Sequence, residues 1–145
     1  MHVPFYPDIS VSRDKSLYEF VSIGKRGKIH KVVQFSELLD YYNIALGDKL
    51  SNGTFDFDAV TDNGDLPQII ATVVQIIVKY TDYFPEKTLA IYGSDEVRMK
   101  LYGRAIRNSF NEFNMLFDIW GIREDFVKEV FNPKESYFGF LIKRK

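Results

Sequence analysis

Cysteine is absent from this chain of 145 residues. Its absence excludes disulfide bonds, thiolate catalysis and zinc sites with cysteine ligands, and it fits a reducing compartment. A strong excess of charge is also missing, because 19 Lys and Arg residues face 20 Asp and Glu residues, for a net charge of −1. No overall field therefore attracts the molecule to nucleic acid or to an anionic membrane, and such binding would require a local patch.

Long hydrophobic runs are missing as well. The longest apolar stretch covers residues 69–78, contains Thr72 and Gln75, and is only about half of what a bilayer span requires. Residues 1–7 contain neither the cationic segment nor the apolar segment of a secretory signal. We therefore expect a cytoplasmic protein without a membrane partner.

Aromatic residues, in contrast, are abundant, with 13 Phe and 9 Tyr in a chain that is 46% hydrophobic. This composition argues against disorder and predicts large side chains between a sheet and its helices. The length predicts a single domain over residues 1–145 with a real core. Residues 1–15 mix proline, aromatic and small polar residues, which predicts an extended N-terminal arm held down by Phe5 and Tyr6.

Apolar periodicity and turn residues predict the secondary structure. The expected strands are 17–23, 29–35, 40–48, 87–92, 115–120 and 137–143, with a strand or an ordered loop at 55–60. The expected helices are 66–83, 95–111 and a short one within 123–131. This pattern predicts an α+β fold with a single mixed, mainly antiparallel sheet and two long helices, in the order strand-strand-strand-helix-strand-helix-strand-strand. That order is loosely ribonuclease H-like.

The first long helix has clear boundaries and an unusually apolar surface. Asp65 can cap it, and Pro67 suits its first turn. Its polar positions form one narrow stripe, namely Gln68, Thr72, Gln75 and Lys79. A helix of this kind must be almost completely covered by the rest of the protein.

The second long helix carries Arg98 on its apolar face. At about 100° per residue, Arg98 shares this face with Leu101 and Ile106. A buried guanidinium cannot lose its charge, so it needs an anionic or carbonyl partner. That partner is either a carboxylate of this chain, such as Glu19 or an aspartate between 56 and 65, or a bound ligand.

A candidate anion site lies at the start of the same helix. The turn at Ser94 follows a core strand, where free backbone N–H groups and the positive end of a helix favour an anion. Ser94, Arg98 and Tyr102 could then hold a phosphate or a carboxylate. Because Asp95 and Glu96 already place negative charge in this turn, a structural ion pair of Arg98 remains the alternative.

Four sequence motifs in these segments resemble those of an uncharacterised bacterial domain-of-unknown-function family of about 150 residues. They are Tyr-Asn-x-Ala-x-Gly-Asp at 42–48, Asn-Gly-Asp at 63–65, Gly-Ser-x-x-x-Arg-x-x-Leu-Tyr at 93–102, and a closing Tyr-x-x-Phe-Leu-x-Lys-Arg-Lys at 137–145. The resemblance covers most of residues 18–145. It implies the segment boundaries and draws attention to Arg98, but it implies no established activity.

Basic residues suggest a nucleic-acid-binding surface as an alternative function. They lie on the opposite face of the second long helix and at the tip of the first hairpin: Lys100, Arg104, Arg107, Lys25 and Arg26. Ordinary solvated charge explains the same residues, since the total charge is almost neutral. No RNA-binding sheet motif or zinc-finger pattern accompanies them.

Metal and cofactor sites are not predicted. Asp56, Asp58, Asp62 and Asp65 do not follow the spacing of a calcium loop, and the two histidines lack metal-binding partners nearby. A divergent metal-dependent nuclease would have to use Glu19 with Asp95 or Glu96, which is an incomplete set. The sequence also lacks a nucleophile elbow, a phosphate loop and a dinucleotide turn.

The leading functional hypothesis is therefore a small non-catalytic binding or regulatory module that acts through a protein partner or self-association. A nucleic-acid-binding protein and a divergent nuclease are the alternatives.

Overall fold

The computed structural model describes residues 4–58, 62–92 and 96–145, with the backbone alone at 96–98. These residues form one nine-stranded sheet in the order β1-β2-β3-β4-β6-β9-β7-β8, and β5 pairs with β4. Strand β4 pairs in parallel with β6, whereas the pairs β1–β2, β2–β3, β4–β5, β6–β9, β7–β8 and β7–β9 are antiparallel. The predicted α+β fold with a mixed, mainly antiparallel sheet is thereby confirmed.

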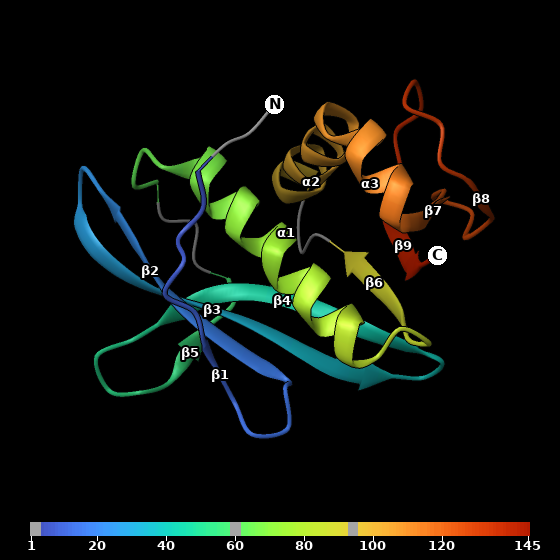
Figure 1. The fold of residues 1–145 in the computed structure, drawn as a ribbon. Coiled ribbons are helices and arrows are strands. Elements are labelled where there is room, and N and C mark those ends of the chain that lie inside the picture. The colour runs from blue at the N-terminus through green and yellow to red at the C-terminus, as the bar shows by residue number, and fades with distance from the viewer. Residues whose placement is uncertain (1–3, 59–61, 93–95) are drawn as a thin grey trace. The chain divides into compact units, whose positions relative to one another are not determined.

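The elements follow one another along the chain as Figure 1 shows. The strands are β1 (Ser10–Val11), β2 (Leu17–Gly24), β3 (Gly27–Leu38), β4 (Tyr41–Lys49), β5 (Phe55–Asp56), β6 (Thr88–Tyr92), β7 (Phe117–Ile122), β8 (Lys128–Val130) and β9 (Gly139–Arg144). The helices are α1 (Leu66–Tyr83), α2 (Glu96–Asn108) and α3 (Phe110–Leu116).

The chain divides into two compact units. Unit 1 contains Met1–Ser36 and Ala45–Tyr83, and unit 2 contains Glu37–Ile44 and Phe84–Lys145. The single domain expected from the length stays a prediction.

In unit 1, helix α1 packs on one face of the β2–β3 hairpin (Figure 1). The hairpin has the predicted position, with Gly24 opposite Gly27. Phe35 of β3 stacks on Tyr80 of α1 with ring centroids 3.8 Å apart, and it meets Tyr18 edge to face. These aromatic contacts form the core that the composition predicted.

Helix α1 has the bounds that Asp65 and Pro67 predicted, but one residue of its polar stripe is buried. Thr72 is fully buried, because the N-terminal arm lies over it and the backbone N–H of Tyr6 donates to its hydroxyl. The segment before β1 thus contacts the body of unit 1 through Tyr6, whereas Phe5 is exposed.

In unit 2, helix α3 contributes to the core on one face of the sheet. Phe113 of α3 lies 5.9 Å from Phe117 of β7, and Phe110 lies 5.3 Å from Phe131. A second cluster contains Ala90, Ile122 and Leu141, against which Tyr41, Tyr92 and Trp120 pack.

Two predictions in unit 2 are wrong. The strand expected at 115–120 begins only at Phe117, because Phe110–Leu116 forms α3. Met115 and Leu116 are exposed residues of this helix, and they misled the prediction because they extend the apolar–polar alternation of the strand toward its N-terminus. The helix expected within 123–131 is instead a turn followed by β8. Here Phe126 adopts a left-handed backbone with φ of 65°, which a helix cannot contain.

Candidate functional site

A buried polar network lies in unit 1 where the N-terminal arm, β2 and the start of α1 meet. Asp65 is only 4% exposed. Its Oδ2 atom accepts hydrogen bonds of 2.5 Å from the hydroxyls of Tyr6 and Ser22. Asp65 was predicted as a helix cap, and its backbone carbonyl indeed accepts from the N–H of Ile69. Its carboxylate, however, binds side chains that are distant in sequence.

Asn63 holds the tip of the β2–β3 hairpin in the same network. Its amide oxygen accepts from the N–H of Arg26 at 2.6 Å, and its amide nitrogen donates to the carbonyl of Gly27 and to the hydroxyl of Ser22. The carbonyl of Asn63 also accepts from the N–H of Lys25. A Cβ on Gly24 would lie 1.9 Å from that carbonyl oxygen, so glycine is required there.

Tyr6 attaches the N-terminal arm to this network. Its hydroxyl accepts from the N–H of Ile23 while it donates to Asp65, and its ring stacks on Phe20 at 6.0 Å. Burial, and then the hydrogen bond to the Asp65 carboxylate, raise the pKa of Tyr6. The arm is therefore held by both polar and aromatic contacts.

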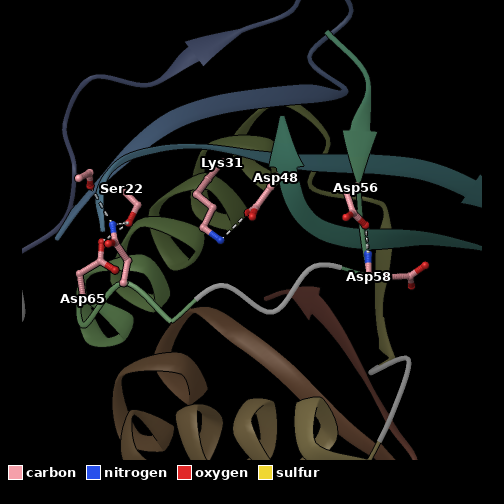
Figure 2. Close-up of polar contacts among 8 residues, drawn as sticks. Ser22, Lys31, Asp48, Asp56, Asp58 and Asp65 are labelled. Atoms are coloured by element: carbon pink, nitrogen blue, oxygen red, sulfur yellow. Dashed lines mark hydrogen bonds and ion pairs between the residues drawn. The ribbon is translucent and has the colours of Figure 1, made fainter. Parts of the chain in front are cut away.

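A buried ion pair joins β3 to β4. The ammonium of Lys31 lies 2.5 Å from Oδ1 of Asp48, and the two side chains are almost fully buried (Figure 2). In contrast, Lys49 and Glu19 form a pair at 3.0 Å in which both side chains are partly exposed. Asp48 and Asn63-Gly64-Asp65 belong to the motifs that carry the family resemblance, so these motifs supply Asp48, Asn63 and Asp65 to the buried polar contacts of unit 1.

The other aspartates of this region form turns. Asp56 accepts from the N–H of Asp58 at 3.0 Å (Figure 2). Asp62 accepts from the N–H of Gly64, which together with Lys25 lowers the pKa of Asp62. Among the described residues, no group of three or more His, Asp or Glu side chains could hold a metal ion.

Among the described side chains, two buried polar atoms have no hydrogen-bond partner, Oδ1 of Asp65 and the hydroxyl of Tyr18. Burial raises the pKa of Tyr18 to about 12, with smaller contributions from Tyr83 and Tyr80. Both atoms lie inside the packed body of unit 1, where the polar groups around Asp65 stabilise the arm and the hairpin.

The anion site expected from the sequence falls largely outside the described residues. Ser94 lies outside them. Arg98 belongs to α2, but its side chain also lies outside the described part. Tyr102 is half-buried on α2. The burial of Arg98 and the anion site stay predictions.

The basic residues of the nucleic-acid alternative belong to different units. Lys25 and Arg26 lie in unit 1, where Lys25 pairs with Asp62 at 3.2 Å. In unit 2, Arg104 is exposed on α2 together with Lys100, while Arg107 donates to the carbonyl of Glu135 at 3.4 Å. For the nuclease alternative, Glu19 pairs with Lys49, Asp95 lies outside the described residues, and Glu96 is described only in its backbone.

A surface that the sequence did not predict lies beside β8 in unit 2. We call it the β8 patch, and it consists of Phe126, Val127, Val130 and Phe138. Phe126 is 74% exposed, Val130 77% and Phe138 45%. The rings of Phe126 and Phe138 meet edge to face at 5.5 Å.

The turn before β8 places Phe126 at its tip. The N–H of Arg123 donates to the carbonyl of Val127, and the N–H of Phe126 donates back to the carbonyl of Arg123. The Asp125 carboxylate accepts from the N–H of Val127. Such three-residue loops end in a left-handed residue that is commonly glycine, so the Phe in this position hid the turn from the sequence analysis.

Comparison with known proteins gives one family and no activity. The model of the family of unknown function DUF6934 matches residues 2–145. No curated protein and no solved structure matches the chain. No helix of the described residues is long and apolar enough to cross a membrane.

Proposed function

We propose that this chain, which belongs to the family of unknown function DUF6934, is a small non-catalytic binding module that contacts a protein partner through the β8 patch. The observation that carries the proposal is Phe126, an exposed aromatic residue in a left-handed backbone conformation. Its position in the turn favours glycine, and the fold does not bury its ring.

The conformation of Phe126 is unfavourable for the isolated chain. A bulky residue at positive φ costs on the order of 1 kcal/mol or more relative to glycine. Its contact with Phe138 returns about 0.5–1 kcal/mol, so the Phe brings the fold no clear advantage. A partner that buries the ring would account for both its type and its position, because aromatic residues are enriched among the residues that dominate binding energy.

The surroundings of Phe126 support a contact surface of more than one residue. Val127, Val130 and Phe138 are also exposed, and exposed apolar clusters commonly mark interaction sites. The exposed Leu39, also at positive φ, lies in the turn between β3 and β4, two strands inside the sheet order. It lacks an open strand edge beside it and is therefore a suitable control.

The polar groups of unit 1 support a structural rather than a catalytic use of the family motifs. Asp65 accepts from Tyr6 and Ser22, and Asp48 accepts from Lys31. These bonds fasten the arm, the hairpin and two strands to one another.

Site-specific photo-cross-linking tests the proposal. A benzophenone amino acid replaces Phe126 in the full-length protein, and the same group replaces Leu39 in the control. We expect irradiation of living cells to yield a discrete adduct with a polypeptide from position 126 only. The adduct should disappear when Val130→Ser and Phe138→Ser are added. Equal labelling from both positions, or none from position 126 in a folded protein, would contradict the proposal.

The Phe126→Gly variant gives an independent measurement. Relief of the backbone strain and loss of the ring contact oppose each other, so its unfolding free energy should stay within about 1 kcal/mol of the original value. It should nevertheless fail to compete for the partner captured by cross-linking. A variant that competes as well as the original protein would remove Phe126 from the binding surface.

A further inference from the structure

We infer that Asn52, in the turn between β4 and β5, is a site of spontaneous covalent modification at which the asparagine becomes isoaspartate or aspartate with loss of ammonia. The dipeptide Asn-Gly occurs twice in this chain, at residues 52–53 and at residues 63–64. The structure distinguishes the two positions, because the first lies in an exposed turn and the second in the buried network of unit 1. The inference goes beyond the proposed function and does not involve the β8 patch.

The reaction needs only the chain itself and water. The backbone nitrogen of the glycine, which no Cβ shields, forms a bond to the side-chain amide carbon of the asparagine. The bond from that carbon to the amide nitrogen breaks, and ammonia leaves with the proton of the attacking N–H, so that a cyclic succinimide remains. Water then opens this ring. Opening at the former side-chain carbonyl gives aspartate, whereas opening at the former backbone carbonyl gives isoaspartate, whose side-chain methylene lies in the main chain.

The turn that contains Asn52 is free to adopt the conformation that ring closure requires. Residues 51–54 are all exposed, and a Cβ added to Gly53, which has φ of 85°, would meet no atom within 4 Å. The N–H of Gly53 donates to the carbonyl of Leu50 at 2.9 Å, and the N–H of Leu50 donates to the carbonyl of Thr54 at 2.8 Å. Exposed backbone bonds of this kind open locally at a small cost in free energy.

Two hydrogen-bond donors already point at the amide oxygen of Asn52. The backbone N–H of Thr54 donates to it at 3.0 Å and the hydroxyl of Thr54 donates at 2.6 Å. The first of these bonds closes a ring that includes the nitrogen of Gly53, so it holds the amide carbon close to the attacking atom. The oxygen gains negative charge when that atom attacks, and donors already in place stabilise such charge.

Asn63 has the same neighbour in the sequence but the opposite environment. It is only 2% exposed, and its side-chain amide makes three hydrogen bonds to the β2–β3 hairpin. The N–H of Gly64, which would have to attack, donates to the Asp62 carboxylate at 3.1 Å. Ring closure here would break all these bonds and open the network around Asp65. The fold therefore protects Asn63 while unit 1 remains folded.

The modification should change the β4–β5 turn and little else. It adds a carboxylate, and isoaspartate also lengthens the main chain between the two strands by one methylene group. Strand β5 pairs with β4 at Asp48↔Asp56 and Lys49↔Phe55 and lies off the main path of the sheet. We therefore expect the modified turn to loosen β5, with the aromatic contacts between β3 and α1 unchanged.

Incubation of the full-length protein at physiological temperature in mildly alkaline buffer tests the inference. Mass spectrometry of protease fragments measures the product at each position, and an isoaspartyl methyltransferase with S-adenosylmethionine measures isoaspartate independently. The product should form at Asn52 at least about tenfold faster than at Asn63, the factor that a difference of about 1.4 kcal/mol in opening free energy gives. In concentrated urea the two rates should converge. Asn52→Ser should abolish methylation of the folded protein.

Thr54 allows a test of the two donors that leaves the dipeptide intact. Thr54→Val keeps the backbone donor and the shape of the side chain but removes the hydroxyl, and it should slow the reaction of Asn52 about threefold, a smaller effect than in an enclosed active site because water competes. Thr54→Ser restores a hydroxyl and should react at the original rate. The rate at Asn63 in urea should be the same in all three proteins.

The outcomes decide between the two positions without reference to the β8 patch. Equal rates at Asn52 and Asn63 in the folded protein, or product at Asn63 alone, would overturn the inference. A rate at Asn52 that Thr54→Val leaves unchanged would overturn the role of the hydroxyl. Cross-linking from position 126 tests the proposed function separately, so either conclusion can fail while the other stands.

Discussion

Removing the charge of Lys31 is the most direct test of the energetics of unit 1. In the Lys31→Met variant, the carboxylate of Asp48 loses the ammonium that lies 2.5 Å away, while both positions remain almost fully buried. Breaking a buried ion pair in this way costs about 3–5 kcal/mol. Because natural domains are stable by about 5–15 kcal/mol, this loss is a large part of the total.

The free energy of unfolding in urea, followed by tyrosine and tryptophan fluorescence, measures the effect. A loss of this size should lower the melting temperature by about 10–15 °C. Lys49→Met is the matched control, because Lys49 pairs with Glu19 in a partly exposed position on the same strand as Asp48. The control should lose less than about 1 kcal/mol.

The double variant Lys31→Met with Asp48→Leu separates the charge from the packing. Replacing both members of a buried pair by apolar residues of similar size is often neutral or stabilising, so the double variant should be more stable than Lys31→Met by at least about 2 kcal/mol. If Lys31→Met lost no more than the Lys49 control, the pair would not be buried as described and the reasoning would be refuted.

Three further predictions concern other residues. Tyr18→Phe removes a buried hydroxyl without a partner and should raise the free energy of unfolding, measured in urea, by about 1 kcal/mol. Burial raises the pKa of Tyr18 to about 12 from 10.0. The stability that depends on keeping this phenol neutral is therefore complete below pH 10 and is lost as the pH rises through 12. An identical loss of stability at alkaline pH in Tyr18→Phe would contradict this. Gly24→Ala should destabilise by about 1–3 kcal/mol through overlap with Asn63, whereas the open Gly53 should lose only about 1 kcal/mol on the same change. A mixed RNA and DNA pool should not shift at low salt, and a shift that Arg104→Glu abolishes would favour the nucleic-acid alternative.

Turn and capping residues in the sequence were sufficient to predict the elements whose boundaries they mark. Asp65 and Pro67 located the start of α1, and the apolar periodicity of residues 17–23 and 29–35 located the two strands of the first hairpin. These signals failed near the C-terminus, where Phe126 occupies a turn position that glycine usually fills. Without a glycine, the spacing of apolar residues resembled a short helix.

The sites depended on contacts that no local pattern contains. The carboxylate of Asp65 binds Tyr6 and Ser22, which are 59 and 43 residues away. The position of Asp65 at the start of a helix could be predicted from the neighbouring sequence, but these distant partners could not. The patch beside β8 was missed because a residue that is exposed on a strand edge was assigned to a helix.

The attachment of Tyr6 means that the segment around this residue is a structural component of unit 1. Its backbone reaches the hydroxyl of Thr72 and its side chain reaches Asp65. A protein produced without residues 1–7 would open both groups to solvent and deprive Phe20 of its stacked ring. Truncation at this end, a common step in preparing small proteins for study, would therefore weaken the body that it was meant to isolate.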